Sequence, residues 1–220
     1  MRKVLQMPYT RDVERDGKLG RYKEVVLCSQ STRRKELLDF VDLSTETKDT
    51  AEREIENHYM DLYREEAFVD RVGLTATHLA HAKIPEDIKP STLYIAADTM
   101  VIHHDQIYNK PKDDAEAYDM IRSYFGETHA VVTGVCLAQD QGYETFYTVT
   151  EVTFIPYFDQ LEELIRDYIA RRKPMDKSGA YGLQEIPPLF IEKVAGDPNN
   201  VVGLPVGEVA RRVFSLGDGK

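Results

Sequence analysis

Short apolar runs alternate along this chain with stretches in which apolar residues recur every three or four positions. The runs are rich in β-branched and aromatic residues and predict strands at 24–28, 93–96, 100–102, 128–138, 143–157 and 189–194. The helical spacing predicts helices that begin near residue 32 and that cover 74–83, 113–125, 161–169 and 206–214. A turn sequence at 139–142 (QDQG) joins the two longest strands, which we therefore expect to form a hairpin. Strands that alternate with helices indicate an α/β or α+β sheet protein.

Two segments do not follow this pattern. Residues 1–23 are polar and charged, and we expect them to form a flexible N-terminal arm ahead of a single domain at 24–216. Residues 44–66 are strongly acidic and polar. We interpret them as an excursion from that domain, partly helical or mobile, rather than as a second domain.

Charge and composition narrow the class of protein. The chain has 220 residues, of which 30% are charged, and a formal net charge of -10 at pH 7. This acidic balance argues against a nucleic-acid partner, because a broad nucleic-acid face needs clustered cations. No run approaches the ~18 apolar residues of a membrane span, and residues 1–23 lack the apolar core of a secretory signal. We therefore expect a cytoplasmic protein without a membrane partner, with Cys28 and Cys136 as buried free thiols.

The turn after the first strand is a candidate anion site. It carries Ser29 and Ser31, and Ser31 or Thr32 is a suitable N-cap for the helix that follows. Arg33 and Arg34 then lie in the first helical turn, where the helix dipole disfavours cations. A helix N-terminus combined with two arginines predicts a site for an anion such as phosphate.

An acid at a strand end is the centre of the candidate chemistry. Asp98 follows an apolar strand and has small neighbours, which allow a ligand to come close. Its carboxylate could hold a metal ion or act as a general base, and the residues leave both roles open. Lys110, before a proline, and Lys177, in a loop with glycines, add cations for phosphates, and Gln184 offers an amide that can pair with a base edge.

Several other catalytic motifs are absent from the sequence. It has no phosphate-binding loop of the Gly-x-x-x-x-Gly-Lys-Ser/Thr type, no His-Glu-x-x-His and no Cys-x-x-Cys. The pairs His78/His81 and His103/His104 lack the further ligands of a zinc site, so we expect no zinc.

In combination, the motifs resemble those of the Maf family of nucleoside triphosphate pyrophosphatases. The resemblance runs from about residue 25 to residue 210. It rests on 27–38 (LCSQSTRRKELL), 79–83 (LAHAK), 97–101 (ADTMV) with 110–111 (KP), 126–135 (GETHAVVTGV), 175–184 (MDKSGAYGLQ) and 196–205 (GDPNNVVGLP). It implies an α/β fold related to that of the inosine triphosphate pyrophosphatases, with a central mixed sheet flanked by helices and a cleft between two lobes.

The resemblance also implies a reaction. A nucleoside triphosphate and water would give the monophosphate and pyrophosphate, with a divalent metal cation (Mg, Mn or Co). Asp98 would be the principal acid and a metal ligand, and Lys83 and Lys110 would be further catalytic residues. The residues expected to bind the substrate are Ser29, Ser31, Arg33, Arg34, Thr99, Lys177 and Gln184.

A second acid is expected before the helix that carries Lys83. Glu65 is the best match for it, and Glu66 and Glu56 are alternatives, because the 44–66 segment is longer than is usual in the family.

The details of the motifs resemble the branch of the family that acts on dTTP and UTP. The adjacent arginines, Asp98-Thr99 and 180–184 (AYGLQ) carry this likeness. Modified pyrimidine triphosphates are further expected substrates, and the resemblance also implies a homodimer, which the residues themselves do not indicate.

Four residues depart from those usual in the family, namely Thr32, Asn109, Ser178 and Glu185, but Asp98 and the cations remain. The alternative function is a non-catalytic nucleotide-binding regulator of cell division.

Overall fold

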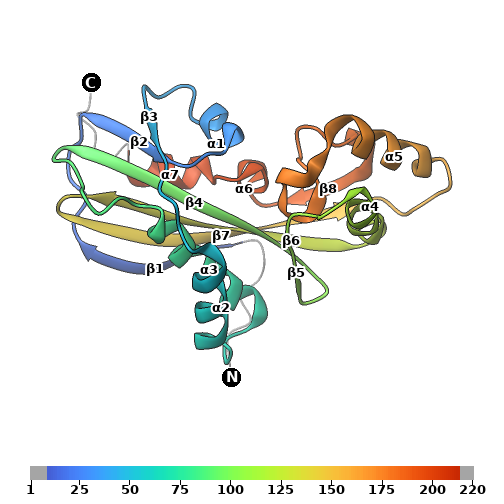
Figure 1. The fold of residues 1–220 in the computed structure, drawn as a ribbon, viewed down its shortest axis with the longest axis horizontal. Coiled ribbons are helices and arrows are strands. Elements are labelled where there is room, and N and C mark those ends of the chain that lie inside the picture. The colour runs from blue at the N-terminus through green and yellow to red at the C-terminus, as the bar shows by residue number, and fades with distance from the viewer. Residues whose placement is uncertain (1–8, 214–220) are drawn as a thin grey trace.

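The structure is a computed structural model that describes residues 9–213, in which a single mixed sheet dominates (Figure 1). Eight strands form it in the order β1-β7-β6-β4-β2-β3, with β5 paired to β4 and β8 paired to β7. The strands are β1 (Tyr9–Gly17), β2 (Glu24–Cys28), β3 (Ser44–Glu46), β4 (Thr92–His103), β5 (Gln106–Tyr108), β6 (Thr128–Gln139), β7 (Gly142–Phe154) and β8 (Ile191–Ala195). The sheet is mixed because β2 pairs parallel to β3 and β4, whereas β4, β6 and β7 pair antiparallel.

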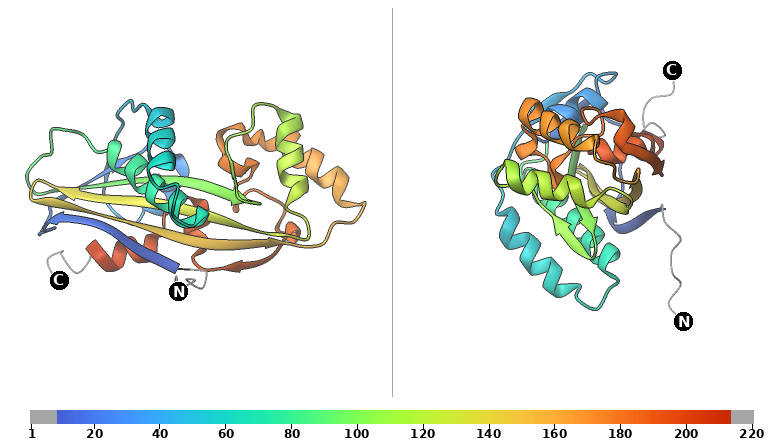
Figure 2. Two further views of the ribbon diagram at one scale, coloured as in Figure 1. Left: turned by 90° about the horizontal axis from the view of Figure 1, so that it is seen from below. Right: turned by 90° about the vertical axis from the view of Figure 1, so that its right-hand side faces the viewer.

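The helices divide the molecule into two lobes along the long strands β4, β6 and β7 (Figures 1 and 2). They are α1 (Thr32–Leu37), α2 (Glu52–Leu62), α3 (Phe68–Ala82), α4 (Asp114–Ser123), α5 (Leu161–Arg172), α6 (Pro198–Val202) and α7 (Val206–Val213). In the larger lobe, α7 packs on one sheet face and α3 on the opposite face. In the smaller lobe, α4 and α5 pack over the far ends of the strands. The expected central mixed sheet with helices and two lobes is confirmed.

The edge of β4 is open at the boundary between the lobes. On one side of this opening β2 pairs with β4 as far as Ile95, and on the other side β5 begins to pair at Val101. Asp98 and Thr99 lie in the gap between these two partners. Their backbone is held on the other edge by β6, where Asp98 faces Gly134. A rigid strand therefore presents both side chains at an edge that neighbouring strands leave uncovered.

Gly134 brings α3 close to this part of the sheet. A Cβ atom at position 134 would lie 2.2 Å from the carbonyl carbon of Ala76 and 2.4 Å from the backbone nitrogen of Thr77. Any side chain here would push the helix outward, because both neighbours are backbone atoms. The close packing fixes α3, and its C-terminal end carries Lys83 to the same place as Asp98.

The N-terminal segment differs from its prediction. The sequence predicts an arm at 1–23, but Tyr9–Gly17 forms β1, an edge strand antiparallel to β7, while residues 1–8 lie outside the described residues. Its polar side chains are compatible with a strand because one face is exposed, and they find partners: Asp12 pairs with Arg212, and Arg11 pairs with Asp70. An edge strand held by backbone pairing and surface charges has little apolar signal in the sequence.

The predicted hairpin and the predicted free thiols are confirmed. The hairpin forms between β6 and β7, with Gln139 opposite Gly142. Cys28 and Cys136 are both buried and free. The acidic segment 44–66 contributes β3 and α2, so it is ordered. Within residues 9–213, no helix has the length and apolar character that crossing a membrane would require.

Candidate active site

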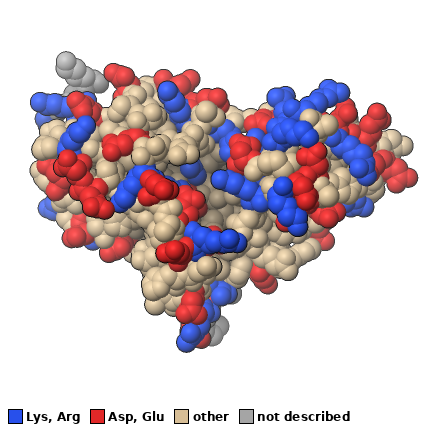
Figure 3. Space-filling view, in the orientation of Figure 1, with Lys and Arg blue, Asp and Glu red and all other residues tan. Residues whose placement is uncertain are grey.

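A large cavity lies where the two lobes meet at the open edge of β4. Its volume is about 1150 Å³, and in the space-filling view basic and acidic side chains surround a hollow at the centre of this face (Figure 3). Ten of the predicted site residues line it: Ser29, Ser31, Arg33, Arg34, Lys83, Asp98, Thr99, Lys110, Lys177 and Gln184. These residues come from segments far apart in the sequence, and the fold brings them to one place.

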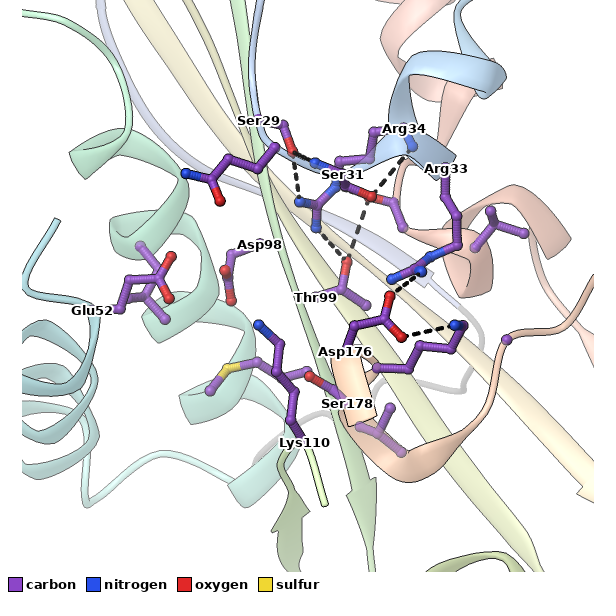
Figure 4. A pocket seen from close by; sticks show the side chains of 18 of the residues that line it. Ser29, Ser31, Arg33, Arg34, Glu52, Asp98, Thr99, Lys110, Asp176 and Ser178 are labelled. Carbon is purple, nitrogen blue, oxygen red and sulfur yellow. Dashed lines mark hydrogen bonds and ion pairs between the residues drawn. The ribbon is translucent and has the colours of Figure 1, made fainter. Parts of the chain in front are cut away.

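One wall of the cavity is organised by Arg34. Its Nε donates to the carbonyl oxygen of Gly203 at 2.7 Å, and its two terminal nitrogens donate to Ser29 Oγ at 3.2 Å and Thr99 Oγ1 at 3.0 Å. Burial lowers the pKa of this guanidinium, and the nearby Asp98 carboxylate opposes that effect. Ser31 caps α1 as predicted, because its Oγ accepts the backbone N–H of Arg34 at 3.4 Å. Arg34 thus ties the turn after β2 to the open edge of β4 (Figure 4).

Arg33 points across the cavity to the other lobe. Its Nη1 lies 2.9 Å from Asp176 Oδ2, and Lys177 Nζ lies 2.8 Å from Asp176 Oδ1 (Figure 4). Lys177 also approaches Glu185 at 3.3 Å. Burial opposes ionisation of Asp176, but hydrogen bonds from Lys177 and Arg33 outweigh it and lower its pKa to about 2. Asp176 is therefore an anion between two cations that are expected to bind phosphates.

Three carboxylates, Glu52, Glu56 and Asp98, form an acidic cluster on the opposite wall, next to Lys83. Lys83 Nζ lies 2.6 Å from Asp98 Oδ1 and 3.0 Å from Glu52 Oε1. The pKa of Glu56 is raised by burial and then by the neighbouring Asp98 carboxylate, with a smaller contribution from Glu52. Carboxylates packed this closely favour a further cation among them.

Lys110 completes the site from the smaller lobe. It follows β5, and in Figure 4 its side chain points into the cavity toward Asp98. Its loop is anchored to the segment that follows Lys177 in the same lobe, because the carbonyl oxygen of Asn109 accepts the backbone N–H of Gly179 at 3.2 Å. The carboxylate of Asp98 thus has Lys83 beside it and Lys110 in front of it.

Glu65, the expected second acid, is not among the residues that line the cavity. Its side chain is 88% exposed and pairs with Arg64 at 3.6 Å. Residue 65 lies beyond the C-terminal end of α2, whereas the N-terminal end of that helix faces Lys83. Of the alternatives, Glu56 lines the cavity.

The sequence analysis missed Glu52 and Asp176 as site residues. Glu52 and Glu56 are four residues apart, the spacing of one helical face, and this signal was available in the sequence. Asp176 is next to Lys177 in a motif that was noted, but its pairing with Arg33 depends on the tertiary fold.

A divalent cation fits the residues of the acidic cluster. Among the described residues, no group of three or more His, Cys, Asp or Glu is arranged to hold a metal ion. However, Asp98 and Glu52 already converge on one cation, the Lys83 ammonium. One or two carboxylates together with substrate phosphates and water are the ligands that Mg²⁺ takes in sites of phosphoryl chemistry. The cluster therefore suits an ion that arrives with a triphosphate.

Comparison with known proteins agrees with the site geometry. A family model described as "Maf-like protein" matches residues 24–215. A dTTP/UTP pyrophosphatase of Geobacillus sp. (strain WCH70) is 37% identical over 195 residues, which cover 89% of this chain and 99% of the relative. A dTTP/UTP pyrophosphatase of Bacillus velezensis is 39% identical over 189 residues, which cover 86% and 94%. With the family model spanning most of the chain and relatives of this similarity, the protein belongs to the Maf family.

Proposed function

We propose that this protein hydrolyses nucleoside triphosphates to the monophosphate and pyrophosphate, with dTTP and UTP as preferred substrates. The observation that carries the proposal is the pairing of an acidic cluster with cations on facing walls of one cavity, at the open edge of β4. Relatives named dTTP/UTP pyrophosphatase, which are 33–39% identical to this chain, support the same reaction.

The cations would bind the triphosphate. Arg33, Lys83 and Lys110 come from three separate segments and lie around the cavity, so they can contact different phosphates. Positioned positive charge stabilises the charge that develops as the bond to the leaving pyrophosphate breaks. Asp176 would release Arg33 and Lys177 when a phosphate takes its place between them.

The acidic cluster would activate the attack. Water adds to the α-phosphorus, the bond from that phosphorus to the bridging oxygen breaks, and pyrophosphate leaves. Asp98 would take the proton of the water, and with Glu52 it would also hold a divalent ion. Such an ion supplies charge neutralisation on the phosphates and polarisation of a bound oxygen. Lys83, in contact with both carboxylates, keeps them oriented toward the cavity.

Gln184 is proposed to read the base. It lines the cavity beside 178–183, and its amide can both donate to and accept from a pyrimidine edge. Gln184 is exposed, so its amide becomes buried only when a base covers it. A purine presents a different donor pattern and would leave the covered amide unpaired, which costs about 1–3 kcal/mol. We expect dTTP and UTP to be preferred over ATP and GTP by roughly 10- to 100-fold in kcat/KM, from that same energy range.

A panel of nucleoside triphosphates tests the proposal. Products are identified by phosphorus NMR, with Mg²⁺, Mn²⁺ or Co²⁺ present or with a chelator. Monophosphate and pyrophosphate from dTTP and UTP, lost on chelation, are the expected result. Orthophosphate and a diphosphate would refute the bond that is cleaved, and a preference for GTP or 7-methyl-GTP would refute the base preference. Tight binding without turnover would instead favour the non-catalytic regulator.

A further inference from the structure

Helix α2 reaches the active site although little of it is buried. It carries Glu52 at its N-terminal end and Glu56 one turn later, and both line the cavity. None of its residues is fully buried. Ile55 and Met60 pack partly buried against the core between α3 and the sheet. Two members of the acidic cluster are therefore held by a helix with few buried contacts.

The ion pair at the active-site end is too weak to hold the helix by itself. Glu52 is 54% exposed where it meets Lys83. An ion pair that is open to solvent contributes at most about 1 kcal/mol, because water and salt screen it. Another contact must fix the direction in which α2 points.

A cluster of three rings, named the ring stack after its central pair, provides such a contact at the other end of the helix. The ring centroids of Tyr59 on α2 and His78 on α3 lie 3.6 Å apart, and the rings are parallel within 3°. Tyr63, the residue after the last turn of α2, lies beside this pair, with its ring 5.9 Å from His78 and 6.0 Å from Tyr59, and its hydroxyl is 2.9 Å from His78 Nε2. The ring stack thus joins α2 to α3 by a face-to-face ring contact and by a hydrogen bond.

The stack and the acidic cluster lie along the same pair of helices. Glu52 and Tyr59 are seven residues apart on α2, about 10 Å along a helix axis. Their partners Lys83 and His78 are five residues apart on the segment that contains α3, in the opposite chain direction. The two helices therefore run antiparallel where they touch, and they lie together below the sheet in Figure 1. A shift of α2 at the stack would displace Glu52 by a similar amount.

We propose that Tyr59, Tyr63 and His78 are positioning residues for catalysis, which hold α2 so that Glu52 and Glu56 face Lys83 and Asp98. The rings do not touch the cavity, and their effect on turnover passes through the two glutamates. This inference rests on the proposed function, because turnover of a triphosphate is its main readout.

A double-mutant cycle between the stack and Glu52 tests it. The variants are Tyr59→Ala, the matched control Tyr59→Phe, Glu52→Gln, and Tyr59→Ala combined with Glu52→Gln. Tyr59→Ala should lower kcat about 5- to 20-fold with KM changed by less than about threefold, as expected when catalytic groups lose their orientation. Tyr59→Phe keeps the ring, so its kcat and KM should stay within about twofold of wild type. In the Glu52→Gln background the alanine substitution should cost clearly less than it does in wild type, because Glu56 is then the one glutamate left for the rings to position. The same fold-loss in both backgrounds would overturn the proposal.

Two further measurements keep the inference testable by itself. If Tyr59→Ala does not fold, Tyr63→Phe removes just the hydroxyl contact with His78 and should lower kcat by about two- to fivefold, again with a smaller loss in the Glu52→Gln background. Hydrogen exchange of the α2 backbone should be faster in Tyr59→Ala than in wild type and unchanged in Tyr59→Phe. An inactive wild-type protein would refute the proposed function, and equal exchange in wild type and Tyr59→Ala would then refute the inference.

Discussion

Replacing Asp98 by Asn separates the chemical role of this carboxylate from its structural role. Asn has nearly the same shape, and its amide oxygen can still accept a hydrogen bond from Lys83, but the negative charge is lost. Asp98 and Lys83 are 18% and 14% exposed and lie 2.6 Å apart, so the charge matters to both. Lys83 keeps Glu52 at 3.0 Å, which prevents an unpaired buried ammonium. We therefore expect a loss of about 1–2 kcal/mol in the free energy of unfolding, below the cost of leaving a buried charge alone.

The stability loss and the activity loss should differ clearly. For a chain of this size, 1–2 kcal/mol lowers Tm by about 2–8 °C, and the variant stays folded at 25 °C. Turnover should fall at least ~100-fold, the size of a general acid–base contribution. Thermal unfolding and steady-state assays with dTTP measure the two quantities, and Asp105→Asn, in the exposed turn before β5, is the matched control. Unchanged turnover with the expected Tm would show that Asp98 takes no part in the reaction.

Three further predictions concern the rest of the cavity. Arg33→Ala and Lys110→Ala should each raise the transition-state barrier by roughly 2–4 kcal/mol, the usual cost of removing a positioned charge that stabilises the transition state. A variant whose kcat/KM equals that of wild type would show that its residue is a surface cation without a role in the reaction. Glu52→Gln should lower kcat/KM by about 10- to 100-fold, within the range for acid–base and metal-binding groups, whereas Glu65→Gln should have no effect. The reverse result would restore Glu65 as the second acid. Glu56→Gln should raise Tm at pH 7 but not near pH 4, because the raised pKa of Glu56 in the folded protein makes wild type less stable as the pH rises from the unfolded-state pKa to the folded-state pKa. Equal Tm shifts at both pH values would contradict burial and the Asp98 charge as the cause of the raised pKa.

The sequence predicts most of the regular elements but not the feature that creates the site. Apolar runs at 93–96 and 100–102 mark β4, and helical spacing marks α4 and α5. That β4 is uncovered between Ile95 and Val101 depends on where β2 and β5 pair with it. Strand register is a tertiary property, because partners are chosen by packing across the whole sheet. Local patterns placed Asp98 at the end of a strand, whereas it lies inside the continuous strand β4, and they did not show that this strand has an open edge.

Acidic composition made α2, the helix that carries Glu52 and Glu56 to the cavity, hard to recognise. In 52–62 the apolar residues Ile55 and Tyr59 recur at helical spacing, and Leu62 continues the pattern. The many charges of the segment suggested an excursion, although a helix that is half exposed carries charges over most of its surface. The contacts that place it, Tyr59 on His78 and Glu52 on Lys83, join residues that no local window contains.

The net charge of the chain describes the cavity poorly. The whole protein carries -10, but six Lys or Arg and five Asp or Glu line the cavity, so the site has one more cation than acid. The signs are only partly separated: one wall holds Asp98, Glu52 and Glu56 around Lys83, and the other holds Arg33 and Lys177 around Asp176. A triphosphate is attracted to the cationic wall and repelled by the acidic one. A substrate that arrives with a divalent cation brings the positive charge that the acidic wall needs, so the arrangement favours the metal-bound nucleotide over the free one.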